Sequence, residues 1–181
     1  MLKFCFAVAI LCIGSVNSNM EVYSSNNKLQ TKLMDVPAKF GGRIPAEGIK
    51  GIVVPVKPKT ACSAVQSPPN DAMYKNYKKL ALIELDGHKG DNEKCTFEVK
   101  VRNAQNAGFD AAVVHYYNSD DYVEMAAKNG NGITIPAVFI SGTSALLLED
   151  QVYPYTSGYY VILNNTPGDF SGSAITTSYN N

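Results

Sequence analysis

The closest approach to a catalytic cluster in this sequence is His115, followed by three acidic residues, Asp120, Asp121 and Glu124. An imidazole beside several carboxylates could bind a metal ion, or transfer protons as a general acid and base. Acidic residues are also common in the first turn of a helix, where the helix dipole stabilises negative charge. We therefore interpret this group as a histidine at the end of a strand that precedes a helix N-terminus, and we predict no metal site and no cofactor.

Other residues that could do chemistry lack the sequence patterns that their chemistry requires. Residues 141–144 do not form the Gly-x-Ser-x-Gly motif of a hydrolase nucleophile. The glycines at 87 and 90 do not form a Gly-x-Gly-x-x-Gly phosphate-binding loop. A basic and aromatic stretch at residues 74–79 is interpreted as the solvated edge of a following strand rather than a site for an acidic partner. We predict no catalytic residues, and therefore no enzyme.

The first 18 residues have the layout of a secretory signal peptide. Lys3 supplies a positive charge, residues 4–13 are apolar, and Val16 and Ser18 stand at the third-last and last positions before a cleavage site. The apolar run is shorter than the roughly 20 residues that a transmembrane helix needs. We expect cleavage after Ser18, a secreted or lumenal location, and no transmembrane segment in this chain.

One disulfide bond is expected between the cysteines that remain after this cleavage. Cys5 and Cys12 lie within the leader, which leaves Cys62 and Cys95. In an oxidising compartment an isolated pair indicates a disulfide, whereas a metal pair or a nucleophilic cysteine would need histidine or cysteine neighbours that the sequence does not supply. The bond would close a loop of about 34 residues and stabilise the fold by about 3–4 kcal/mol in the chain-entropy model.

The composition indicates a neutral globular protein. The chain has 181 residues, with 16 basic and 16 acidic side chains, which argues against binding to nucleic acid or to an anionic membrane surface. Its 45% of hydrophobic residues can form a core, and its 18% of charged residues is below the usual ~25%, as in β-rich extracellular proteins.

Strands and helices are predicted to alternate along the middle of the chain, which favours an α/β arrangement with a barrel or sandwich. Residues 19–34 are polar and predict an arm that adds one strand. Residues 96–107 fit a strand by their alternation and a helix by their apolar face and a C-terminal glycine, and we predict a helix. The predicted strands are near 50–56, 80–85, 111–116, 135–140 and 159–163, and the other predicted helices are near 120–128 and 141–150.

Four stretches of the sequence together resemble the protease-associated (PA) domain, in particular the lumenal domain of transmembrane RING-type ubiquitin ligases. They are residues 36–51, 95–114, 119–125 and 135–140, in the order in which the family has them. The resemblance implies an α/β fold with a closed β-barrel or sandwich of about seven strands and two or three flanking helices, with residues 96–107 helical. It implies a PA domain over residues 19–165, followed by a flexible polar tail at 166–181.

The resemblance implies a non-catalytic module that binds a protein or peptide in the secretory or endolysosomal pathway. The alternative is the lumenal, substrate-recruiting part of a transmembrane RING-type ubiquitin ligase. Such ligases continue into a membrane helix and a RING domain, which this chain of 181 residues does not contain. We therefore expect that it does not ubiquitinate a substrate by itself, and that it is more similar to small secreted glycoproteins made of a PA domain alone.

Two further sites are predicted on loops. The candidate binding residues are His88, Lys89, Asp91 and Lys94, in a polar loop whose end is anchored at the disulfide, because an anchored loop loses less entropy on binding. Many PA domains have Arg-Gly-x-Cys-x-Phe before the helix, whereas residues 92–97 here read Asn-Glu-Lys-Cys-Thr-Phe. Asn164 begins the only Asn-x-Ser/Thr sequon of the mature chain and is the predicted glycosylation site.

Overall fold

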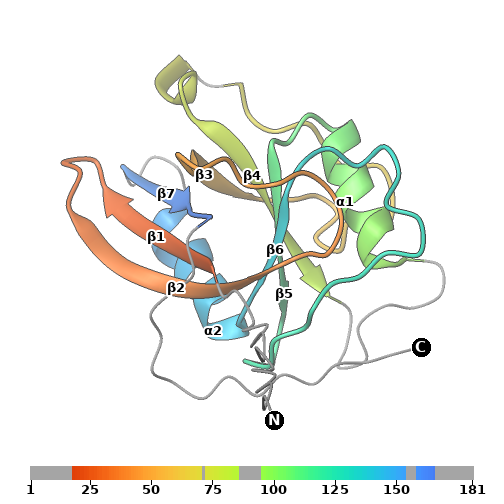
Figure 1. Cartoon of the computed structure of the whole chain (residues 1–181). Coiled ribbons are helices and arrows are strands. Elements are labelled where there is room, and N and C mark those ends of the chain that lie inside the picture. The colour runs from red at the N-terminus through yellow and green to blue at the C-terminus, as the bar shows by residue number, and fades with distance from the viewer. Residues whose placement is uncertain (1–17, 71, 86–94, 154–157, 166–181) are drawn as a thin grey trace, which may run out of the picture.

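A computed structural model describes residues 18–70, 72–85, 95–153 and 158–165, and these form a closed barrel of seven strands (Figure 1). Around the barrel the strands follow the order β1-β2-β6-β5-β4-β3-β7, so the predicted closed structure of about seven strands is confirmed. Neighbours from β3 to β6 are parallel, and the remaining pairs are antiparallel. The strands are β1 (Ser18–Ser24), β2 (Leu29–Pro37), β3 (Ile49–Pro55), β4 (Lys78–Leu85), β5 (Ala111–Tyr116), β6 (Ala137–Ile140) and β7 (Tyr159–Leu163).

Two apolar cores lie on the two faces of the parallel strands. Leu80 and Leu82 of β4 belong to the core inside the barrel, whereas Ala81 and Ile83 pack toward helix α1 (Phe97–Asn106) on the outside. Figure 1 shows α1 lying alongside the β4–β5 side of the barrel. A strand that is buried on both faces is apolar at every position, which explains the continuous apolar runs of β4 and β5.

Helix α1 confirms the prediction for residues 96–107. The Thr96 side chain caps its N-terminus by accepting a hydrogen bond from the Val99 N–H, and Gly108, with φ of +94°, follows its C-terminus. The disulfide between Cys62 and Cys95 is present just before this helix, with its Cα atoms 5.3 Å apart. The bond therefore ties the loop after β3 to the start of α1.

The prediction of a single strand for residues 19–34 was wrong, because the segment forms the β1–β2 hairpin. Met20 and Val22 of β1 and Leu33 of β2 are buried in the barrel core, while most of the residues between them are polar and exposed. Asn27, with φ of 61°, forms the turn. In a strand with one solvated face only alternate residues need to be apolar, so the polar ones gave the segment the appearance of an arm.

The prediction of a helix near residues 120–128 was also wrong. This segment contains no helix and runs across the outside of the barrel, where its polar groups have partners in other elements. Asp120 accepts hydrogen bonds from the Thr143 N–H and hydroxyl at 2.7 and 2.8 Å. Glu124 pairs with Lys39. These hydrogen bonds from Thr143 lower the pKa of Asp120 below its ordinary value.

The predicted helix over 141–150 is present as two consecutive parts. Helix α2 (Gly142–Leu147) begins at Ser141, whose side chain accepts a hydrogen bond from the Ser144 N–H, and the π-helical turn η2 (Leu148–Val152) continues it. Ala145, Leu148 and Val152 pack into the core inside the barrel. Among the residues that the structure describes, no helix has the length and apolar composition to cross a bilayer.

Candidate binding groove

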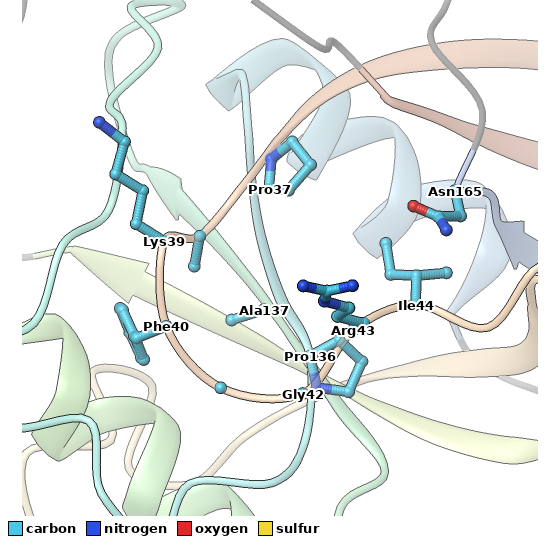
Figure 2. A pocket seen from close by; sticks show the side chains of 11 residues that line it. Pro37, Lys39, Phe40, Gly42, Arg43, Ile44, Pro136, Ala137 and Asn165 are labelled. Atoms are coloured by element: carbon cyan, nitrogen blue, oxygen red, sulfur yellow. The ribbon is translucent and has the colours of Figure 1, made fainter.

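A groove lies between the loop that connects β2 to β3 and the start of β6 (Figure 2). Its volume is about 260 Å³, below the roughly 300–1,000 Å³ of typical small-molecule sites. A space of this size suits one or two side chains of a peptide better than a cofactor. The lining residues are Pro37, Ala38, Lys39, Phe40, Gly41, Gly42, Arg43, Ile44, Pro136, Ala137 and Asn165.

Backbone hydrogen bonds fix the loop that forms one wall of the groove. The Ala38 N–H donates to the Ala137 carbonyl, the Lys39 N–H to that of Met125, and the Gly42 N–H to that of Ile135. The bonds to Ala137 and Ile135 extend the pairing of β2 with β6, in which Pro37 lies opposite Val138, whereas the bond to Met125 ties the loop to the segment after β5. The wall of the groove is therefore held to the barrel by main-chain contacts.

Two glycines allow this loop to approach the segment before β6. Gly41 has φ of +82°, a conformation that favours glycine. Gly42 lies so close to the main chain that a Cβ atom would overlap the Thr134 carbonyl oxygen and stand 2.9 Å from its carbonyl carbon. The Gly-Gly pair is therefore required by close packing as well as by backbone conformation.

Helix α1 holds the segment that leads into the floor of the groove. The Gln105 side-chain oxygen accepts hydrogen bonds from the Thr134 and Ile135 N–H groups at 2.6 and 3.2 Å, and its amide nitrogen donates to the Gly132 carbonyl. One and two turns earlier, Arg102 donates to the Asn129 carbonyl and Glu98 accepts from the Asn129 N–H. The polar face of α1 therefore positions residues 129–135.

Polar and apolar groups both line the groove, and one cationic side chain is directed into it. Of the apolar residues that line it, Pro37 is partly exposed, whereas Ile44 and Pro136 are buried, and the Arg43 guanidinium lies near the middle of the groove in Figure 2. Lys39 also lines the groove, but its side chain extends away from it and pairs with Glu124. None of the lining residues is acidic.

The cluster that the sequence offered for catalysis does not come together. His115 is buried, and its Nδ1 lies 2.9 Å from the Tyr116 carbonyl oxygen, so this nitrogen is the donor. Asp120 binds Thr143, Glu124 pairs with Lys39, and Asp121 accepts a hydrogen bond from the Ser119 hydroxyl. Within the described part of the chain, no group of three or more His, Cys, Asp or Glu residues could hold a metal ion.

Burial lowers the pKa of His115, and the nearby carboxylates of Glu149 and Glu84, which act in the opposite direction, have smaller effects. The unfolded chain therefore takes up a proton at a higher pH than the folded protein. We expect the free energy of unfolding to fall as the pH is lowered from about 7 through the ordinary histidine pKa of ~6.5. His115→Gln should flatten this decline, measured as urea midpoints between pH 7.5 and 5.

His88 supplies the matched control, because it is the only other histidine and the sequence places it in a polar loop. His88→Gln should leave the pH dependence of the urea midpoint as it is in the unaltered protein. An equal slope in the His115→Gln variant and the unaltered protein would contradict the role assigned to burial.

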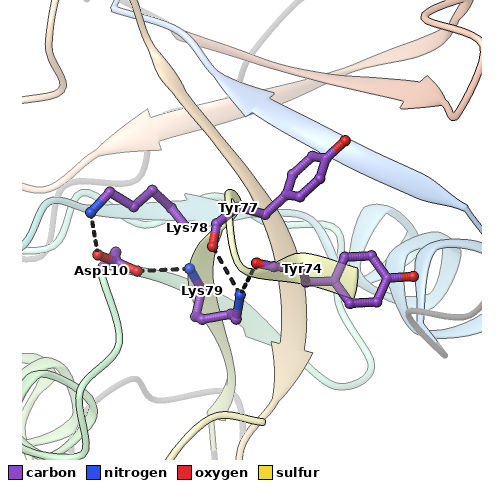
Figure 3. Close-up of polar contacts among 5 residues, drawn as sticks. All are labelled: Tyr74, Tyr77, Lys78, Lys79 and Asp110. Atoms are coloured by element: carbon purple, nitrogen blue, oxygen red, sulfur yellow. Dashed lines mark hydrogen bonds and ion pairs between the residues drawn. The ribbon is translucent and has the colours of Figure 1, made fainter. Parts of the chain in front are cut away.

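The basic and aromatic stretch at residues 74–79 serves to anchor the turn before β4 (Figure 3). The Lys79 ammonium donates to the Tyr74 and Tyr77 carbonyls at 2.7 and 2.9 Å. The Lys78 ammonium pairs with one Asp110 carboxylate oxygen, and the Lys79 N–H donates to the other, each at 2.8 Å. Two of its lysines therefore act within the fold.

The other predicted site residues have different outcomes. His88, Lys89, Asp91 and Lys94 lie outside the described residues. Asn164 follows β7 directly and is half-buried; its N–H donates to the Asn19 carbonyl, and its side chain hydrogen-bonds to Glu21. The groove was not predicted from the sequence, although residues 36–51, which include its wall, carried part of the family resemblance.

Comparison with known proteins identifies one family and a set of longer relatives. The family model of the PA domain matches residues 49–148. E3 ubiquitin-protein ligase RNF13 from Homo sapiens is 37% identical over 158 residues, which cover 86% of this chain and 39% of that protein. E3 ubiquitin-protein ligase Godzilla from Drosophila melanogaster is 33% identical over 152 residues, which cover 83% of this chain and 26% of that protein. E3 ubiquitin-protein ligase ZNRF4 from Homo sapiens is 38% identical over 145 residues, which cover 78% of this chain and 32% of that protein.

This chain thus spans about two fifths or less of the length of these curated relatives.

Solved structures share the fold at low sequence identity. A peptidase precursor from Shewanella amazonensis matches with a TM-score of 0.54 and 19% identity, over 81% of this chain and 33% of that one. The subtilisin-like protease Apa1 from Pseudoalteromonas matches with a TM-score of 0.52 and 14% identity, over 86% of this chain and 35% of the protease chain.

Proposed function

Because this chain belongs to the PA domain family, we propose that it is a non-catalytic module that binds a protein or peptide in the secretory or endolysosomal pathway. We place the binding site in the groove between the β2–β3 loop and the start of β6. The observation that carries this proposal is a groove lined by both polar and apolar groups, with a fixed main-chain frame and one cation directed into it. A preformed site of this kind loses little entropy on binding.

A secreted or lumenal location accompanies this function. The leader pattern of residues 1–18 favours entry into the secretory pathway, and the Cys62–Cys95 disulfide suits an oxidising compartment. We propose cleavage after Ser18 and a glycan on Asn164. Mass spectrometry of the secreted protein, before and after treatment with peptide N-glycosidase, tests both: an N-terminus at Met1 or an unchanged mass would contradict the respective proposal.

A second candidate function is the recruitment of substrates to a transmembrane RING-type ubiquitin ligase. It is favoured by three relatives that are named E3 ubiquitin-protein ligases and that align with most of this chain over a minor part of their own length. Sequencing of full-length transcripts tests it, and the expected result is a reading frame that continues into a membrane helix and a RING domain. A stop codon after Asn181 in every transcript would contradict it.

Site-specific photocrosslinking tests the binding function and its location together. The mature chain, expressed in secretory cells, would carry benzoylphenylalanine in place of Asn165, an exposed residue at the groove. The matched control carries it in place of Leu29, which is 40% exposed at the opposite end of β2. Captured proteins would be identified by mass spectrometry and then tested as purified partners.

We expect a partner that crosslinks at position 165 and not at position 29, and that binds the purified module in solution. Equal crosslinking at both positions, or a partner that does not bind once purified, would contradict the groove as the binding site. Hydrolysis of a peptide by the pure chain would contradict the non-catalytic assignment.

A further inference from the structure

Arg43 is a cation without a carboxylate partner in the described part of the chain. The structure shows five ion pairs among residues 18–70, 72–85, 95–153 and 158–165, and none includes Arg43. Arg43 is exposed, and its guanidinium extends into the groove (Figure 2). Lys39, four positions earlier on the same loop, has its charge matched by Glu124.

The groove therefore carries a local positive charge on a chain whose formal net charge is zero. Its other lining residues are neutral, apart from the paired Lys39. A guanidinium can bind a carboxylate through two parallel hydrogen bonds, which makes it more selective for this group than an ammonium is. Arg43 is exposed, so such a contact would stay partly hydrated, and its selectivity would come from the paired hydrogen bonds rather than from burial.

We propose that the groove recognises an acidic peptide segment, with Arg43 binding one of its carboxylates. Pro37 and Ala38, which line the groove and are partly exposed, would contact an apolar part of the same segment. This inference rests on the proposed binding function and adds the chemical class of the ligand. The carboxylate can belong to an Asp or Glu side chain or to a free C-terminus, and the experiment separates these two sources.

The test begins with random decapeptides displayed on phage and selected against the mature protein. Sequences that are enriched would be synthesised with a fluorophore, and their Kd would be measured by anisotropy for three proteins: unaltered, Arg43→Gln and Lys28→Gln. Lys28→Gln is the matched control, since it removes an equal charge from an exposed side chain that lies in the β1–β2 turn, outside the groove lining. Both residues are exposed, so neither change should lower the melting temperature appreciably.

We expect the enriched peptides to contain Asp or Glu, and Arg43→Gln to weaken their binding by about tenfold, as loss of a charge-assisted contact predicts. Lys28→Gln should change the Kd by no more than about twofold. Replacing the acidic residue of the peptide by its amide should weaken binding to the unaltered protein, but have little further effect on Arg43→Gln. If the free C-terminus is the ligand, amidation of the peptide C-terminus should have that effect instead.

Two results would overturn the inference. If peptides are enriched without an acidic residue and bind equally well to Arg43→Gln, the groove binds peptides but not through a carboxylate, and the binding function survives. If no peptide is enriched and no partner crosslinks at position 165, both the inference and the proposed function fail.

Discussion

Replacing Cys62 and Cys95 together by serine should lower the free energy of unfolding by about 3–4 kcal/mol. The bond joins residues 33 positions apart in the sequence, so its removal frees a long loop in the unfolded chain. In the folded protein the loop has other anchors. The buried Lys100 donates to the Thr60 carbonyl at 2.8 Å, and Asn103 donates to the Ala61 carbonyl at 2.8 Å.

These anchors remain in the double variant, so we expect the native fold to persist with reduced stability. Urea unfolding followed by circular dichroism at pH 7 measures the loss. Reduction of the unaltered protein is the control, and its unfolding midpoint should match that of the Cys62→Ser, Cys95→Ser variant. A double variant with the midpoint of the oxidised protein would show that the bond does not restrain the unfolded chain.

The strands that face two cores could be predicted from the sequence, and so could β7, which faces one core but has only apolar and aromatic residues; the polar β1–β2 hairpin could not. The apolar runs of β4 and β5 indicate strands because both of their faces are buried. In β1 only alternate residues, such as Met20 and Val22, lie in the core, and the polar residues between them conceal the pattern. A short segment with few apolar residues does not reveal its periodicity.

The acidic residues after β5 show where local rules fail for a physical reason. Asp120 does bind the N–H group of a helix terminus, as the dipole rule predicts, but the helix is α2 and the group belongs to Thr143. Glu124 binds Lys39 in the β2–β3 loop. The sequence correctly indicated that these acidic side chains bind a helix N-terminus or a cation. The tertiary fold determines which helix and which cation they bind.

The groove could not be predicted because its two sides are distant in the sequence. The two sides of the groove meet because β2 pairs with β6, with Pro37 opposite Val138. No local sequence pattern encodes that pairing. The sequence drew attention to residues 36–51 through the resemblance alone. What the sequence does carry is the Gly41-Gly42 pair, whose close packing becomes interpretable only when the neighbouring Thr134 and Ile135 carbonyls are known.

Replacing Gly42 by alanine should destabilise the fold by about 1–3 kcal/mol and disrupt the groove, because the added methyl group has no space. The atoms that it would meet are the carbonyl oxygen and carbon of Thr134, which belong to the main chain and cannot rotate away. The loop must therefore move outward, which would break the hydrogen bond from the Gly42 N–H to the Ile135 carbonyl and displace the adjacent Arg43. Thermal and urea unfolding measure the first effect, and crosslinking from position 165 measures the second.

Gly108→Ala is the matched control, because it separates steric conflict from backbone strain. Gly108 has φ of +94°, and beyond its own chain neighbours no atom lies within 4 Å of the place that an alanine Cβ would occupy. Alanine there should therefore cost about 1 kcal/mol through conformation alone. Gly108 lies after α1 and away from the groove lining, so partner capture should be retained. If Gly42→Ala unfolds no more readily than Gly108→Ala and still captures the partner, close packing of the β2–β3 loop does not shape the site. If Gly42→Ala loses both stability and capture of the partner, the hydrogen-bonded main chain of the β2–β3 loop forms the binding surface itself.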